Sequence, residues 1–277
     1  MKTWYSLNGG NNITFTGLTG TINQALWDAL SEGNVSIRFY ANDSVGNIGF
    51  AEVTIRKDVT APTININSPN SNELFGTSVP SFNVEIYYAN LDSMWYTLDI
   101  GLTNTTFTTN GTINQSAWDA LPDGNIIIRF YANDSAGNIG FAEVTINKDV
   151  VAPIITIINP QNSYVIGATA PNFDISIDEL NLDKMWYSLN GGNNVTFTGL
   201  TGTINQALWD ALSDGNVNIR FYANDTLGRI GFKEVTVVKM TSQPSPPGIP
   251  GYNILFLLGI ASTVAVIIVK KKLNHLN

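Results

Sequence analysis

The sequence contains no cysteine, and its one histidine, His275, stands close to the C-terminus. Without cysteine there can be no disulfide framework, no cysteine-ligated zinc site and no thiol nucleophile. Charged residues make up only 13% of the chain, and the net charge is −8. Because an acidic surface repels phosphate backbones, we expect no nucleic-acid partner. Aspartate and glutamate are the only plentiful groups that could act in catalysis.

What the chain has in abundance is internal repetition. Trp186–Asp225 and Trp4–Asp43 differ at three of forty positions, and Trp95–Asp134 is a looser copy with the same 91-residue spacing. A fixed period of this length predicts tandem domains, each large enough for a core of its own. In this register residue 1 falls inside a repeat. We therefore expect residues 1–58 to be a truncated copy and the chain to be a fragment.

Within the repeats, apolar and polar residues alternate along short segments. The clearest segment is 35–41, whose apolar face carries Val35, Ile37, Phe39 and Ala41. The same alternation recurs in the other two copies, so it predicts a half-buried β-strand. Segments 63–67, 82–86, 94–98 and 105–109 are expected to be strands as well. Asn8-Gly9-Gly10 is a turn signal that predicts a hairpin.

Each repeat has one helical signal, and it is short. In the first copy it places Ile22, Leu26, Trp27 and Leu30 on one face at helical spacing. A helix of two or three turns is not stable alone, so its tryptophan must pack against the sheets.

The frame WYSLNGG…W..L..G.V.IRFYANDS.GN…V.I.KDV.APTI resembles the immunoglobulin-like repeats of bacterial and archaeal surface proteins. The resemblance covers residues 1–240 and implies an all-β fold of tandem β-sandwiches, here without the antibody-type disulfide. We expect a truncated repeat at 1–58, complete repeats at 59–149 and 150–240, and a proline-rich linker at 241–251. Such domains serve as spacers, adhesins and accessories of enzymes alike, so the fold alone does not define the function.

The end of the chain has a different composition. Residues 254–269 carry no charge and precede Lys270, Lys271 and Lys272. This pattern predicts one transmembrane helix at 252–269 and a basic cytoplasmic tail at 270–277, with the repeats outside the cell. A buried core helix is the alternative. Residues 248–252 and this tail resemble C-terminal sorting or anchoring signals of archaeal surface proteins, which implies a membrane-anchored archaeal protein.

Aspartates near the repeat junctions are candidate calcium ligands. In an immunoglobulin-like sandwich, the last hairpin turn lies where the chain enters, which would bring Asp58 near Asp134, and Asp149 near Asp225. Carboxylates are suitable ligands for Ca²⁺, as the analogy with cadherins also implies. The alternative is an ordinary turn in which the aspartate accepts backbone N–H groups. Arg229 replaces the asparagine of the other turns, which weighs against a metal there. We expect no other cofactor.

Asn-x-Ser/Thr sequons are candidate glycosylation sites in an extracellular chain. They are Asn12, Asn34, Asn42, Asn104, Asn110, Asn114, Asn133, Asn194 and Asn224. Glycans at Asn42, Asn133 and Asn224 would crowd the calcium positions, so these two hypotheses compete. The Trp-Tyr and Phe-Tyr pairs could form a sugar-binding face, but core packing is expected for most of them. The exceptions, on the opposite face, are Tyr40, Tyr131 and Tyr222.

Together these features favour a non-catalytic cell-surface protein. The acids recur in every copy, which fits residues that support a fold better than a catalytic pair. We expect a single-pass membrane protein whose repeats form an extracellular stalk, spacer or adhesion module. A carbohydrate- or protein-binding adhesin is one alternative, and the anchor portion of a larger surface enzyme is another. Partners would be the membrane and cell-surface proteins or glycans.

Overall fold

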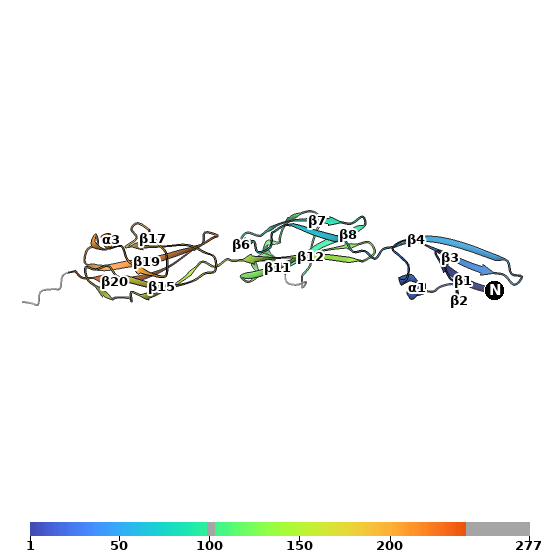
Figure 1. Cartoon of the computed structure of the whole chain (residues 1–277), viewed down its shortest axis with the longest axis horizontal. Coiled ribbons are helices and arrows are strands. Elements are labelled where there is room, and N and C mark those ends of the chain that lie inside the picture. The colour runs from blue at the N-terminus through green and yellow to red at the C-terminus, as the bar shows by residue number, and fades with distance from the viewer. Residues whose placement is uncertain (99–102, 242–277) are drawn as a thin grey trace, which may run out of the picture. The chain divides into compact units, whose positions relative to one another are not determined.

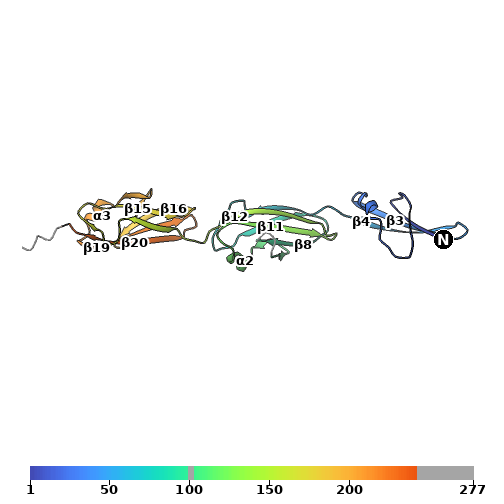
Figure 2. The same ribbon diagram turned by 90° about the horizontal axis from the view of Figure 1, so that it is seen from below.

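The computed structural model describes residues 1–98 and 103–241 (Figures 1 and 2). The chain divides into unit 1, Met1–Val151, and unit 2, which begins at Ala152. Below, residues 1–58 are called repeat 1, residues 59–149 repeat 2 and residues 150–240 repeat 3. Unit 1 therefore holds repeats 1 and 2 with the first two residues of repeat 3, and unit 2 holds the rest of repeat 3.

Repeat 2 consists of two sheets with the strand orders β10-β7-β5 and β6-β12-β11-β8-β9. The strands are β5 (Thr63–Ser68), β6 (Leu74–Phe75), β7 (Ser81–Tyr87), β8 (Leu91–Thr97), β9 (Thr105–Phe107), β10 (Gly111–Thr112), β11 (Gly124–Asp134) and β12 (Ile139–Lys148). β6 pairs parallel with β12, and the other pairs are antiparallel. Their side chains form one shared core, so this is an immunoglobulin-like β-sandwich.

Repeat 3 has the same design, with sheets β13-β15-β18 and β14-β20-β19-β16-β17. Its strands are β13 (Ile154–Asn159), β14 (Val165–Ile166), β15 (Asn172–Asp178), β16 (Leu182–Leu189), β17 (Val195–Phe197), β18 (Thr201–Thr203), β19 (Gly215–Asp225) and β20 (Ile230–Lys239). β14 again pairs parallel with β20.

Repeat 1 is a single sheet with the order β2-β1-β3-β4. Its strands are β1 (Lys2–Leu7), β2 (Ile13–Phe15), β3 (Gly33–Asn42) and β4 (Ile48–Lys57). They correspond to β16, β17, β19 and β20 of repeat 3. Among the described residues, repeat 1 has no counterpart of the β13-β15-β18 sheet of repeat 3. The expected domain boundaries stay a prediction.

The alternating pattern places the core as the sequence predicts. In β11, Ile128, Phe130 and Ala132 are fully buried, while Arg129 between them is only partly covered. The turn between β1 and β2 has left-handed backbone angles at Asn8 (φ 49°) and Gly9 (φ 72°). Two such residues in succession give the turn type that suits the twist of a hairpin, so the predicted hairpin is confirmed.

The predicted helices are present but span only five residues each: α1 (Gln24–Asp28), α2 (Gln115–Asp119) and α3 (Gln206–Asp210). In α2 the Asn114 side chain caps the start by accepting the N–H of Ala117 at 2.9 Å. Trp118 is fully buried, and its Nε1 donates to the carbonyl oxygen of Gly76 at 2.9 Å. Tertiary contacts of this kind hold a helix too short to form alone.

Among the described residues, no helix is long and apolar enough to cross a membrane. The expected transmembrane helix at 252–269, the basic tail at 270–277 and the expected anchoring signal lie outside the described residues. So does the proline-rich linker after Thr241.

Candidate functional site

The turn that follows β3, β11 and β19 in the three repeats is built around an aspartate. In repeat 2, Asp134 Oδ1 accepts the backbone N–H groups of Ala136 and Asn138, both at 2.9 Å. The side-chain amide of Asn138 donates to Asp134 Oδ2 at 2.8 Å, and Gly137 takes a positive φ of 89°. Asp43 and Asp225 accept backbone N–H groups in the same way. The ordinary turn predicted for these aspartates is thus confirmed.

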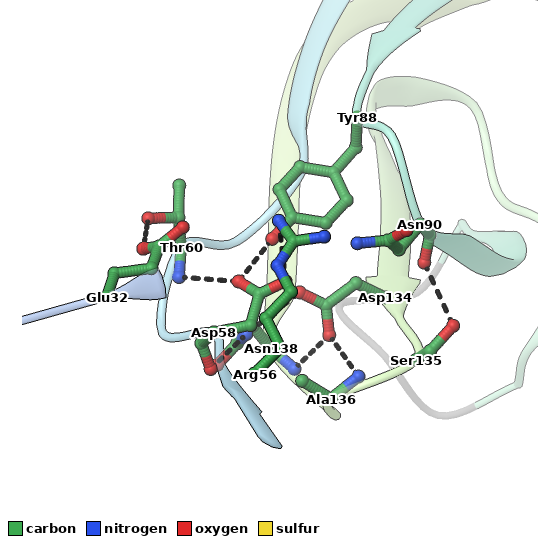
Figure 3. A network of polar contacts seen from close by, with 10 residues as sticks. All are labelled: Glu32, Arg56, Asp58, Thr60, Tyr88, Asn90, Asp134, Ser135, Ala136 and Asn138. Carbon is green, nitrogen blue, oxygen red and sulfur yellow. Dashed lines mark hydrogen bonds and ion pairs between the residues drawn. The ribbon is translucent and has the colours of Figure 1, made fainter. Parts of the chain in front are cut away.

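In unit 1 the linker residue Asp58 reaches this turn, as expected from the strand order (Figure 3). The hydroxyl of Tyr88 donates to Asp58 Oδ1 and also interacts with the carboxylate of Asp134. The amide of Asn138 donates to the carbonyl oxygen of Asp58 at 3.2 Å. Arg56 adds an ion pair, with 3.8 Å between its Nη2 and Asp58 Oδ2. We call Asp58, Tyr88, Asp134 and Asn138 the entry network.

The electrostatics of the entry network follow from these contacts. The hydrogen bond to Asp58, followed by burial, raises the pKa of Tyr88 well above its ordinary value. For Asp134, burial acts to raise the pKa, but hydrogen bonds from Asn138 and Tyr88 outweigh it. The pKa of Asp134 is therefore lowered, and the buried carboxylate is charged at neutral pH.

The donors in this network bear on the calcium hypothesis. Ca²⁺ binds six to eight oxygen ligands. Here the oxygens of Asp58 and Asp134 accept hydrogen bonds from Tyr88, Asn138 and backbone groups, and Arg56 supplies a positive charge. A cation would have to replace these donors. The residues as arranged fit a hydrogen-bonded junction better than a preformed calcium site.

In repeat 3, two positions of the entry network carry different residues. Glu179 stands where repeat 2 has Tyr88, and it and Asp225 offer carboxylate oxygens within 4.8 Å of each other. Arg229 replaces Asn138, and its Nε lies 3.2 Å from Oδ2 of the fully buried Asp225. Asp149 belongs to unit 1, where its N–H donates to the carbonyl oxygen of Phe75 at 2.9 Å. Because Asp149 and Asp225 are in different units, their expected pairing stays a prediction.

The second candidate surface is a row of aromatic rings on the outer face of the larger sheet. In repeat 2, Trp95 and Tyr131 are stacked at 5.2 Å between ring centroids, and Phe141 follows 6.0 Å from Tyr131. The guanidinium of Arg129 lies 4.9 Å above the ring of Phe141, which is 59% exposed. We call this the aromatic row. Its equivalents are Trp4, Arg38, Tyr40 and Phe50 in repeat 1, and Trp186, Arg220, Tyr222 and Phe232 in repeat 3.

The aromatic row corrects one sequence-based expectation and confirms another. Tyr131 and its equivalents lie opposite the core, as predicted. The core packing expected for the Trp-Tyr pairs is wrong for Trp4, Trp95 and Trp186. Successive residues of a strand point to opposite faces, so burial of Tyr96 in the core puts Trp95 on the outer face.

The sequons are in different environments. Six are exposed, namely Asn12, Asn34, Asn104, Asn110, Asn114 and Asn194. Five have a side chain engaged in hydrogen bonds, namely Asn42, Asn110, Asn114, Asn133 and Asn224. A glycan is attached at Nδ2, which donates in Asn110, Asn133 and Asn224. The exposed Asn12, Asn34, Asn104 and Asn194 are therefore better placed for modification than these three, and glycosylation itself stays a prediction.

No protein-family model and no curated protein matches the chain. Among solved structures, a 1.5-MDa bacterial ice-binding adhesin is 17% identical, covering 87% of this chain and 86% of its own, with a TM-score of 0.41. The fibronectin(III)-like modules of Clostridium thermocellum CbhA are 14% identical, covering 65% and 95%, with a TM-score of 0.30. Mouse Cadherin-23 is 14% identical, covering 87% and 86%, with a TM-score of 0.31. With TM-scores this low, the strand order itself remains the evidence for the fold.

Proposed function

We propose that the chain is a non-catalytic extracellular spacer, anchored to the cell membrane by its C-terminal segment. The observation that carries this proposal is the use of the acidic residues. Asp43, Asp134 and Asp225 stand at the same position of each repeat and hold their own turn. A residue needed once per fold recurs in every copy, whereas a single active site does not need to.

A second candidate function is adhesion through the aromatic row. The exposed rings of Phe50, Phe141 and Phe232 recur at one position of each repeat, beside an arginine. Exposed aromatic rings offer apolar faces to sugar rings and to protein side chains. An anchor for a larger surface enzyme is the third candidate. Neither the aspartate turns nor the aromatic row favours it.

Deleting one repeat tests the spacer. A variant without residues 59–149 joins Asp58 to Val150 and so preserves the sequence register. We expect a label at the N-terminus, measured by energy transfer to a membrane dye, to come closer by about 35 Å, the length of an 11-residue strand. The matched control replaces Phe50, Phe141 and Phe232 with serine, which leaves the label height unchanged.

The same variants separate the candidate functions. An unchanged label height after the deletion would contradict the spacer. Loss of attachment to glycans or to cell surfaces in the triple serine variant, with the label height retained, would favour the adhesin.

Calcium at the junction acids is a finer proposal, and it concerns Asp58, Asp134, Asp149 and Asp225. Extracellular calcium modules have Kd values of about 0.1–1 mM. Binding at ten times Kd would stabilise the native state by about 1.4 kcal/mol, so 5 mM CaCl₂ should raise the melting temperature of the full chain by several degrees. Asp225→Asn should lose part of the rise, and MgCl₂ should not reproduce it. An unchanged melting temperature would rule out the calcium junction.

A further inference from the structure

Repeat 2 differs from the other two repeats in the segment that leads from β9 to α2. Repeats 1 and 3 both read TFTGLTGTINQ, at residues 14–24 and 196–206. Repeat 2 reads TFTTNGTINQ at residues 106–115 and is one residue shorter here. It therefore lacks the leucine of the other repeats, which is Leu200 in repeat 3.

The side chain of Asn110 replaces a backbone contact that is lost with this leucine. In repeat 3 the N–H of Ile175 in β15 donates to the carbonyl oxygen of Leu200 at 2.9 Å. In repeat 2 the equivalent N–H, that of Val84 in β7, donates to Asn110 Oδ1 at 2.9 Å. The Asn110 amide also donates to Asn83 Oδ1 at 3.0 Å. Strand β7 thus keeps its partner, although a polar side chain now stands in place of the leucine.

A second apolar residue is replaced by a polar one beside this segment. Tyr187 pairs with Val195 in repeat 3, and the equivalent Tyr96 pairs with Thr105 in repeat 2. Val195 packs against the core of its repeat. Thr105 is partly buried and lines a cleft. Both replacements thus bring polar groups to the same place in repeat 2.

This cleft lies beside β9 and β10, the edge strands of the two sheets of repeat 2. Its volume is about 530 Å³, which suits a small ligand. The rings of Phe82, Tyr96 and Phe107 line it together with four threonines and three side-chain amides. None of the described residues that line it is charged. Neutral hydroxyl and amide groups beside aromatic rings match a ligand that presents both hydroxyl groups and apolar C–H groups.

We propose that this cleft of repeat 2 binds a neutral carbohydrate. The sugar hydroxyl groups hydrogen-bond with the threonine hydroxyls and with the Asn110 amide, which has one N–H group beyond its bond to Asn83. A C–H face of the sugar packs against the ring of Phe107. Acidic sugars are disfavoured, because the lining offers no cation and the chain has a net charge of −8. The site shares no residue with the aromatic row and goes beyond the proposed spacer function.

A binding panel tests the site. The full chain, produced without N-glycans, is applied to immobilised neutral oligosaccharides, acidic oligosaccharides and extended peptides. We expect saturable binding to a neutral oligosaccharide. Calorimetry with that oligosaccharide in solution should give one site per chain, because only repeat 2 carries the asparagine in place of the leucine.

Two variants introduce residues that the other repeats already carry, so the fold and the melting temperature should persist. Thr105→Val restores the residue of Val195 and should weaken binding about tenfold, the usual effect of one lost hydrogen bond. Replacing residues 109–110 with Gly-Leu-Thr restores the segment of repeat 3 and should abolish binding. The control Thr145→Val removes a hydroxyl of β12 that does not line the cleft, and it should bind like the natural chain.

The outcomes that overturn the proposal are specific. It fails if no neutral oligosaccharide binds, or if only acidic oligosaccharides or peptides bind. It also fails if either variant binds the oligosaccharide as tightly as the natural chain does.

Discussion

At the residue scale, Lys148 is a buried cation that faces carbonyl oxygens rather than a carboxylate. It is 4% exposed, and its Nζ donates to the carbonyl oxygens of Trp118 at 2.8 Å and Leu121 at 2.5 Å. These carbonyls end α2, where the helix dipole is negative, so a cation is favourable there. Lys57 and Lys239 make the same contacts in the other repeats. The lysine thus donates hydrogen bonds to C-terminal carbonyl oxygens that a helix this short cannot pair internally.

Replacing this lysine tests its role. Lys148→Met retains the aliphatic length but leaves buried carbonyls without a donor, so we expect a loss of about 2–3 kcal/mol in the free energy of unfolding. Urea unfolding monitored by tryptophan fluorescence measures it. The control Lys184→Met removes a side chain that is 70% exposed and should change stability by less than about 1 kcal/mol. Equal effects of the two substitutions would contradict the capping role.

The entry network shows what sequence reasoning missed at this scale. The expected strand order predicts that Asp58 lies near Asp134, and the structure brings both to the hydroxyl of Tyr88. Tyr88 gave no signal of its own, because it follows β7 and lies 30 residues from Asp58. The contact depends on two sheets meeting, which no local pattern encodes.

At the element scale, the linker before each complete repeat packs against the last strand. A Cβ atom at Gly140 in β12 would lie 1.9 Å from the carbonyl oxygen of Pro62. Gly231 in β20 is equally close to Pro153, at 1.8 Å. Gly49, at the same position of β4, has nothing within 4 Å. Glycine in a strand indicates a close backbone approach, but it does not say which segment approaches.

This difference predicts opposite outcomes for one substitution. Gly140→Ala forces the strand and the linker apart, and we expect a cost of about 3 kcal/mol or more in the stability of repeat 2. Gly49→Ala meets open space and should change stability by less than about 1 kcal/mol. Thermal unfolding of the two single variants measures both values. If both variants melt like the natural chain, the close approach of Pro62 is not a constraint on the fold.

At the scale of the whole molecule, nearly the same strand sequence occurs once in an uncovered sheet and once in a covered sheet. β3 and β19 are almost identical, yet Phe39 is partly exposed and Phe221 is fully buried. Burial is therefore a property of the facing sheet and not of the strand. The contacts that the two complete repeats share point into their cores, which fits the proposed spacer.

The period, the strands, the hairpin turn and the short helix can be predicted from the sequence alone, because they depend on neighbouring residues. Alternation with period two identified the face that carries Val35, Ile37 and Phe39, and the Asn-Gly signal identified a turn. Packing between sheets decides instead whether that face is covered, that the Phe173 ring lies against Gly202, and that Trp95 lies outside while Tyr96 lies inside. Those outcomes depend on contacts between segments far apart in the chain, whose energies arise only when two sheets pack.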